Sequence, residues 1–349
     1  MPTSSQYVNR MKEPAFWMDG ILATSVIEIS HDPAILSEES HEGFWAVQVN
    51  FEGDWTLVRF ADIRDSPFPQ NEWSPTPAQW NSTLDEVEYR NYVEAIREAI
   101  AAGDFYQVNA CRILSRSFNG DLDGLFSRIL DGNPAPYSAY FKVGDTEIAS
   151  ASPELFLKMR STDIGTSLTS SPIKGTSIDG AFGEKDRSEN VMIVDLIRND
   201  LSQICEEGSV DVSRLLGVEE HPGLFHLVSD VTGTLKKDFN WKDFSGALLP
   251  AGSISGAPKS SAIEFIQSHE PQRGPYCGIL GYIDTRGGKC EALLSVAIRI
   301  FWLDKEKQEL KFGSGAGITW GSDPDGEWAE TQLKASRLMR IADGEVVQK

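Results

Sequence analysis

The sequence predicts an α+β fold built on antiparallel sheets. Strand-like runs come in neighbouring pairs around short turns, and helical patterns come in separate blocks rather than in regular alternation with strands. Hydrophobic residues make up 40% and charged residues 24% of the 349 residues, which is an ordinary globular composition. These proportions exclude the disordered, collagen-like and coiled-coil classes.

The first strand pair is expected at 44–63, where apolar and polar residues alternate around a Gly53-Asp54 turn. The stretch 65–82 is rich in Pro, Asn and Ser and predicts a surface linker. We therefore expect residues 1–82 to contribute strands to the same body as the main domain, residues 83–349.

Helical spacing begins after this linker. Thr83 can act as the N-cap with Glu86 three residues further on, and Gly103 ends the helix. The remaining patterns predict strands at 104–114, 133–143, 146–159, 225–235, 276–285, 291–303 and 310–320, and helices at 185–205, 262–268 and 326–341.

Charge excludes some partners. Asp and Glu number 52 against 32 Lys and Arg, so the net charge is −20. No cluster of cations is available for a nucleic acid, and anionic lipid surfaces should repel the chain. Residues 1–13 lack the apolar core of a signal peptide, and no apolar run of membrane-spanning length occurs. The four cysteines show no CxxC spacing, so we expect reduced thiols and a cytoplasmic protein.

Common catalytic motifs are absent, since the chain contains no GxxxxGK[ST], HExxH, GxSxG or EF-hand loop. The glycine-rich run 313–317 lacks the spacing of a dinucleotide site. It is better interpreted as a wall that lets a ligand approach backbone amides.

Three side chains are candidate catalytic residues. Lys174 lies between a proline and a glycine, where a lysine is usually solvated. Glu154 precedes an apolar strand and is either a surface group or a desolvated acid with a raised pKa. His226 lies within a strand and is a hydrogen-bonded structural residue unless a ligand site faces it.

Two further carboxylates lie on predicted helices. Glu189 is expected in the first turn of a helix, and Glu330 lies one turn after Glu327 on the last helix. Such carboxylates usually only balance the helix dipole. If Glu189 and Glu330 converged on one substrate carboxylate, they would instead form a typical Mg²⁺ site.

Ordered motifs along the chain resemble those of the chorismate-utilising enzymes. This family includes component I of anthranilate synthase, component I of aminodeoxychorismate synthase, and the isochorismate and salicylate synthases. The resemblance covers about residues 83–345, and residues 1–82 look like a shortened N-terminal portion. The motifs are GDFYQVNACR, SPELF, PIKGT, EKDRSENVMIVDLIRNDL, HLVSDVTG, PAGSISGAPK, YCGILGY, VAIRI, GAGI and GEWAET.

The resemblance implies packed antiparallel sheets with surrounding helices and an active site in a cleft. It implies that Glu189 and Glu330 hold Mg²⁺, and that Glu154 protonates the departing hydroxyl of chorismate. His226 joins Glu154 and Lys174 as a candidate catalytic residue. The substrate-binding residues it implies are Gln107, Gly175, Thr176, Tyr276, Arg299, Gly315, Ala316, Gly317 and Lys334.

Two positions separate the members of the family. Isochorismate and salicylate synthases are similar here but carry a lysine base where this chain has Gln107, which cannot take a proton from water. Lys174 in PIKGT is similar to aminodeoxychorismate synthase, whereas anthranilate synthases typically show PIAGT. The resemblance thus implies amination of chorismate to 4-amino-4-deoxychorismate, with ammonia from a separate glutamine amidotransferase. Anthranilate and 2-amino-2-deoxyisochorismate remain alternative products.

Overall fold

The computed structural model describes residues 14–163 and 165–347. Residues 1–13, in which we predicted no signal peptide, lie outside the described residues. The helices are α1 (Glu86–Ala102), α2 (Asp123–Gly132), α3 (Glu184–Ser202), α4 (Trp241–Leu248), α5 (Lys259–His269) and α6 (Pro324–Ala342). None of these described helices has the length and apolarity needed to cross a membrane.

The strands of the described residues all pair in the antiparallel sense. They are β1 (Ala15–Met18), β2 (Ile21–Ser30), β3 (Phe44–Val49), β4 (Trp55–Asp65), β5 (Asn81–Ser82), β6 (Gln107–Ser117), β7 (Tyr137–Val143), β8 (Thr146–Ser152), β9 (Leu155–Thr162), β10 (Gly165–Ser171), β11 (Ile173–Ser177), β12 (Asp211–His221), β13 (Leu224–Thr234), β14 (Gly256–Ala257), β15 (Ile279–Asp284), β16 (Glu291–Val296), β17 (Ile300–Asp304) and β18 (Glu309–Thr319).

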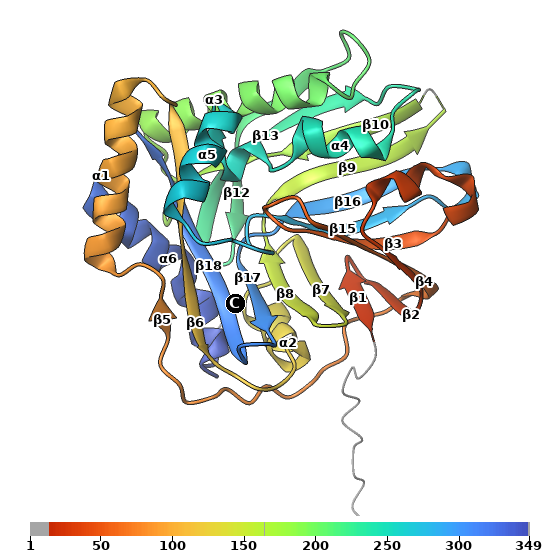
Figure 1. The fold of residues 1–349 in the computed structure, drawn as a ribbon, viewed down its shortest axis with the longest axis horizontal. Coiled ribbons are helices and arrows are strands. Elements are labelled where there is room, and N and C mark those ends of the chain that lie inside the picture. Colours follow the sequence, from red (N-terminus) through yellow and green to blue (C-terminus); the bar gives the residue numbers. More distant parts are fainter. Residues whose placement is uncertain (1–13, 164, 348–349) are drawn as a thin grey trace, which may run out of the picture.

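These strands form one curled sheet, which confirms the predicted α+β class (Figure 1). Its pairings run β6–β18–β17–β8–β7–β1–β2–β4–β3–β15–β16–β9–β10–β13–β12, with β5 and β14 on β6 and β11 on β13. The sequentially distant strands β3 and β15 are therefore neighbours, and so are β6 and β18. Strands from 15–65 thus pair with strands of the following region.

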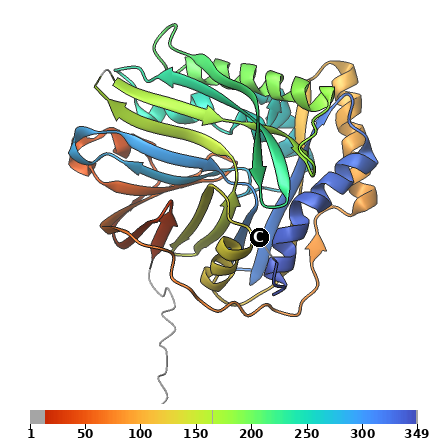
Figure 2. The ribbon, with the colours of Figure 1, turned by 180° about the vertical axis from the view of Figure 1, so that it is seen from behind.

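Helices cover the outside of this sheet. α1 and α6 pack against each other and against β18, as Figure 2 shows from behind. α3 lies along β11 and β13, and α2 lies against β8. The core between these layers is apolar and includes the fully buried Trp45, Tyr89 and Phe244. Burial of such large side chains is the main favourable contribution to folding.

Two long strands predicted from the sequence are wrong, because each is divided into two strands in the structure. The run 146–159 is interrupted at Pro153 and Glu154, and the run 291–303 is interrupted at 297–299. Proline has no N–H for a ladder bond, and Arg299 has a left-handed φ of 54°. The two interruptions face each other, since the Val296 N–H donates to the Glu154 carbonyl over 3.1 Å. Both chains leave the ladder at one place and continue in another part of the sheet.

Other boundaries also differ from the sequence prediction. α2 was not predicted, because its apolar run is short and has a glycine near each end. α5 begins three residues earlier than expected, at Lys259, and α3 begins at Glu184. Glu189 therefore lies in the second turn of α3 rather than in its first.

The N-cap of α1 is Asp85 rather than Thr83. The Asp85 carboxylate accepts a hydrogen bond from the Glu88 N–H, and the Glu88 carboxylate accepts one from the Asp85 N–H, both over 2.9 Å. Thr83 instead bonds to Ile113 across the β5–β6 pair. The helix ends as predicted, because Gly103 adopts a left-handed φ of 91°.

Asp85→Ala is expected to lower the free energy of unfolding by about 1 kcal/mol, since it leaves a backbone N–H of the first turn unsatisfied. Chemical denaturation measures the change. Glu98→Ala, on the exposed face of the same helix, is the control and should stay within about 0.5 kcal/mol of the parent. Equal losses for the two variants would contradict the capping assignment.

Candidate active site

A cavity of about 990 Å³, including the part open to solvent, lies where the interrupted strands meet α3, β18 and α6. The segments 253–254 and 298–299 close one side of it, and the glycines of β18 form another wall. Twelve of the predicted site residues line it: Glu154, Lys174, Gly175, Thr176, Glu189, His226, Tyr276, Arg299, Gly315, Gly317, Glu330 and Lys334. The fold therefore brings together side chains that are far apart in the sequence.

Glu154 lies at the break between β8 and β9 and is 3% exposed. Of the two interpretations of the sequence, the structure supports the desolvated acid and not the surface group. Burial raises the pKa of its carboxyl, while a hydrogen bond from the Ser253 side chain and the charge of Lys174 act in the opposite direction. Such a carboxyl can carry a proton nearer neutral pH than an exposed one.

Lys174 is not a solvated surface lysine. It is half-buried on β11, and its Nζ donates to the Ser253 carbonyl over 2.9 Å. Burial lowers the pKa of its amine, and the charges of Glu189 and Glu154 oppose that shift. A lowered pKa increases the fraction of unprotonated amine, which is the nucleophilic form.

His226 lies on β13 and is 2% exposed. Its Nε2 is 2.9 Å from Arg299 Nη2, so Nε2 accepts from the guanidinium, and its Nδ1 lies 3.3 Å from Thr176 Oγ1. Burial, followed by the Arg299 charge, lowers the pKa of the ring to about 2. The ring is therefore neutral near pH 7, and it orients Arg299 rather than supplying a proton.

Carboxylates and lysines alternate on the wall formed by α3 and α6. Lys185 Nζ lies 2.9 Å from Glu327 and 3.8 Å from Glu189, and Lys334 Nζ lies 2.6 Å from Glu330. Lys334 lowers the pKa of Glu330, whereas burial raises the pKa of Glu189. The prediction omitted Lys185, although its i,i+4 spacing to Glu189 could have indicated it.

No group of three or more His, Cys, Asp and Glu side chains in the described ranges forms a metal cage by itself. Glu189 and Glu330 nevertheless line one cavity. Hard carboxylate oxygens with open positions for water and a substrate carboxylate fit Mg²⁺, which needs few protein ligands.

Glycines in β18 let bulky groups approach its backbone. A Cβ at Gly313 would lie 2.2 Å from the Tyr276 ring, and one at Gly317 would lie 2.3 Å from Gln107 Nε2 and 3.2 Å from Lys174 Nζ. Gln107 is 1% exposed, and its amide has no hydrogen-bond partner among the described residues. Gln107 is absent from the cavity lining, although its amide and Lys174 Nζ both lie beside Gly317. Ala316 lies in the apolar core.

Comparisons with known proteins identify the family of the chain. The family model described as chorismate binding enzyme matches residues 31–340. The chain belongs to this family. It is 36% identical over 273 residues to an anthranilate synthase component 1 of Saccharolobus solfataricus, covering 74% of this chain and 63% of that protein. It is 34% identical over 286 residues to an aminodeoxychorismate synthase component 1 of Escherichia coli, covering 78% and 61%.

The chain thus spans less than two thirds of the length of these curated relatives. Solved structures of the same fold match nearly end to end. A Bacillus anthracis protein described as a 2,3-dihydroxybenzoate-specific isochorismate synthase gives a TM-score of 0.81 at 20% identity, covering 97% of this chain and 98% of that one. Anthranilate synthase component I of Streptococcus pneumoniae gives 0.77 at 23% identity, covering 97% and 95%. These structures confirm the predicted fold.

The buried neutral ring of His226 predicts an acid-sensitive stability. Its pKa is about 2 in the folded protein and about 6.5 when unfolded. The stabilisation is therefore complete above about pH 6.5 and is lost as the pH falls below it. The parent should lose about 1.4 kcal/mol more than His226→Gln between pH 8 and 5.5, measured by chemical denaturation.

His269→Gln is the matched control, since His269 is exposed at the end of α5. It should keep the pH dependence of the parent protein. If His226→Gln also kept it, the buried ring would titrate in the ordinary range and its assignment as a neutral acceptor would be wrong.

Proposed function

We propose that the protein converts chorismate and ammonia to 4-amino-4-deoxychorismate and water. The observation that carries this proposal is the Lys174 amine, which lies in the cavity lined by Glu154 and donates to the Ser253 carbonyl. Relatives named aminodeoxychorismate synthase component 1, at 34% and 36% identity, support it. A nucleophilic amine and a protonated carboxyl in one cavity are the groups that this substitution needs.

Cations around the cavity suit a dicarboxylate substrate in a chain of net charge −20. Arg299 and Lys334 line it, and Arg299 is held by the His226 ring. Burial lowers the pKa of Arg299 to about 10, which still leaves it charged near neutral pH. In this proposal Arg299 and Lys334 bind the carboxylates of chorismate.

We assign Glu189 and Glu330 as the protein ligands of Mg²⁺. When bound, the ion would neutralise the ring carboxylate of chorismate and hold it against α3 and α6. The side chains of Lys185 and Lys334, which now contact these carboxylates, are the cations that the metal would partly replace.

The covalent steps use the chain's own residues. The unprotonated Lys174 amine attacks C2 of the ring, both conjugated ring double bonds shift, and the C4 hydroxyl leaves as water with a proton from Glu154. Ammonia then attacks C4, the two double bonds shift back, and the C2–N bond breaks with its electron pair returning to Lys174. The new ammonium group at C4 returns a proton to Glu154. The nucleophile is regenerated, and the net change replaces hydroxyl by amine at C4. Neutral His226 keeps Arg299 in place throughout.

Gln107 supports ammonia rather than water as the incoming nucleophile. An amide side chain cannot act as a general base toward water. Ammonia is already nucleophilic when unprotonated and needs no such base. We propose that a separate glutamine amidotransferase supplies it. The four cysteines are free thiols, which supports a cytoplasmic location for the enzyme.

A second candidate product is anthranilate or 2-amino-2-deoxyisochorismate. The anthranilate synthase relative at 36% identity favours this alternative. In both of these products ammonia adds at C2, so Lys174 would bind substrate without forming a covalent bond. The two mechanisms therefore differ in whether the Lys174 amine is required.

Lys174→Ala is expected to lower the formation of 4-amino-4-deoxychorismate by about 10³-fold or more, because no other amine can form the C2 adduct. Chorismate, ammonium and Mg²⁺ are incubated with the protein, and products are separated with and without an aminodeoxychorismate lyase. Lys242→Ala, on an exposed turn of α4, is the control and should match the parent. Undiminished turnover by Lys174→Ala, or anthranilate released without the lyase, would refute the proposal.

Glu189→Gln is expected to weaken Mg²⁺ binding about tenfold or more, since it removes one anionic ligand. Calorimetric titration of the substrate-free protein with MgCl₂ measures this affinity. Glu264→Gln, exposed on α5, controls for the change in net charge. Equal Mg²⁺ affinities for the two variants would remove Glu189 from the metal site.

A further inference from the structure

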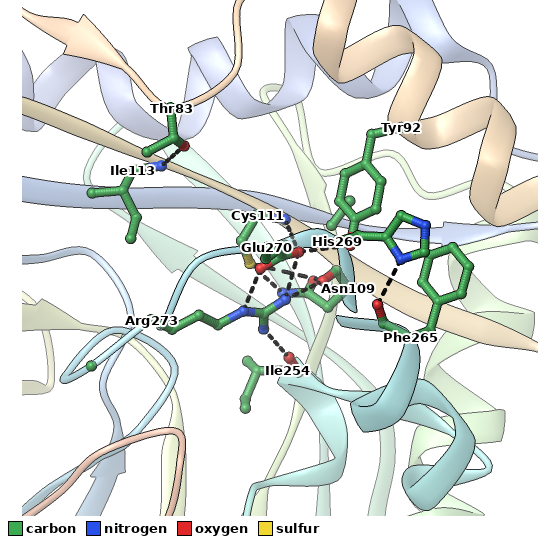
Figure 3. Close-up of polar contacts among 12 residues, drawn as sticks. Thr83, Tyr92, Asn109, Cys111, Ile113, Ile254, Phe265, His269, Glu270 and Arg273 are labelled. Carbon is green, nitrogen blue, oxygen red and sulfur yellow. Dashed lines mark hydrogen bonds and ion pairs between the residues drawn. The ribbon is translucent and has the colours of Figure 1, made fainter. Parts of the chain in front are cut away.

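A second charged cluster lies behind the cavity and takes no part in the proposed chemistry. Arg273, 1% exposed, forms an ion pair with Glu270, whose side chain is 3% exposed (Figure 3). Arg273 Nε donates to Glu270 Oε2 over 2.7 Å, and Nη2 donates to Glu270 Oε1 over 2.9 Å. Two charges so far from water need a complete set of partners, because desolvation of an unpaired ion is costly.

The partners of this pair are mostly backbone groups of separate segments. Arg273 Nη1 donates to the Ile254 carbonyl over 3.1 Å, and Nη2 donates to the Asn109 carbonyl over 2.7 Å. The Phe51 ring lies 4.4 Å from the guanidinium carbon. The guanidinium thus fixes the loop before β14 relative to β6.

The carboxylate of Glu270 links α1 and β6 to the same cluster. It accepts from Tyr92 Oη of α1 over 2.9 Å and from the Cys111 N–H of β6 over 3.0 Å (Figure 3). The turn that carries Arg273 is itself held, since Glu52 accepts from the backbone N–H groups of Arg273 and Gly274. The cluster therefore has little freedom to shift as a unit.

The loop held by Arg273 contacts both reacting groups, the Lys174 amine and the Glu154 carboxyl. Ile254 follows Ser253, whose carbonyl accepts from Lys174 Nζ over 2.9 Å. The Ser253 side chain hydrogen-bonds the Glu154 carboxyl. Ser253 and Ile254 also line the cavity, as does Asn109. Ser253 thus contacts both the Lys174 amine and the Glu154 carboxyl. Its neighbour Ile254 is hydrogen-bonded to the buried Arg273 guanidinium.

We propose that Arg273 is a positioning residue: by holding the Ile254 and Asn109 carbonyls it sets the place of Ser253, and through Ser253 the placement of Lys174 relative to Glu154. The inference rests on the proposed function only for its effect on turnover. Arg273 touches neither substrate nor reacting atoms and lines no part of the cavity.

The shape of the guanidinium explains why arginine is needed. Its planar fork reaches the carboxylate and two carbonyls at once, whereas a lysine ammonium is a single point on a flexible stem. A lysine at position 273 would keep the ion pair with Glu270 but would lose the hydrogen bond to at least one of the two carbonyls, those of Ile254 and Asn109. A displacement of about 1 Å at a reacting group can lower the rate about 10²-fold.

Arg273→Lys tests this inference, with Arg116→Lys as a matched control. Arg116 is also buried, at 2% exposure, and it also pairs with a carboxylate, a backbone carbonyl and an aromatic ring, namely Asp343, Ala342 and Trp80. These partners lie outside the cavity lining. Both variants should lose stability to a similar extent, so thermal unfolding provides the baseline for comparison.

The expected result is a fall in kcat of about tenfold or more for Arg273→Lys, with a smaller change in KM for chorismate. Arg116→Lys should stay within about twofold of the parent. The second readout needs no turnover: reductive methylation with formaldehyde and cyanoborohydride at fixed pH 8, with modification of Lys174 followed by mass spectrometry. Arg273→Lys should slow it about threefold or more, because a loosened loop readmits water and returns the amine toward its ordinary pKa.

The inference is overturned if both variants lose kcat in proportion to stability, or if Lys174 in Arg273→Lys is methylated at the parent rate. Should Arg273→Lys fail to fold, Tyr92→Phe removes only one bond to Glu270 and must still lower kcat and slow methylation. If the parent makes no aminated product, the proposed function fails, while the methylation rates still decide the role of Arg273.

Discussion

The paired interruption of two strands is the constraint on which the cavity depends. β8 and β9 are separated at Pro153 and Glu154, and β16 and β17 are separated at 297–299, where the two breaks share a backbone hydrogen bond. If both strands had continued without a break, Glu154 and Arg299 would be ordinary strand residues, whose side chains point to one face of the sheet or the other. The breaks instead place both residues in the lining of one cavity, which the glycines of β18 also line. The missing Cβ atoms of Gly313 and Gly317 make room for Tyr276 and Gln107. The left-handed φ of Arg299 is retained because the surrounding sheet holds it.

Cations inside the cavity nearly balance its acidic groups. Five carboxyl side chains, those of Glu154, Asp186, Glu189, Glu327 and Glu330, line it together with Lys174, Lys185, Arg299 and Lys334. Burial raises the pKa of Glu154 and lowers that of Lys174, so the neutral form of each group is favoured more than in an exposed side chain. The neutral His226 ring adds no charge but holds the guanidinium.

Local sequence patterns were sufficient for most elements. Periodicity and capping chemistry place several elements close to their observed positions. These are the hairpin at Gly53, the end of α1 at Gly103, and the helices α3 and α6. The errors occur where tertiary contacts override local pattern. The apolar runs 146–159 and 291–303 look continuous, but each divides between two parts of a curled sheet. Asp85 replaces Thr83 as the cap because Thr83 is engaged by Ile113 of the neighbouring strand.

The sequence by itself determined the residue types of the site and their order, through motifs that resemble one enzyme family. It could not determine that Glu154 is desolvated, that Lys174 is held by a carbonyl, or that Lys185 and Glu327 join the same wall. Burial and convergence depend on which distant strands pair, and spacing along a chain carries no measure of distance in space. The Arg273–Glu270 pair is the clearest case, because an i,i+3 ion pair in sequence gives no sign that its guanidinium reaches the carbonyls of two other segments.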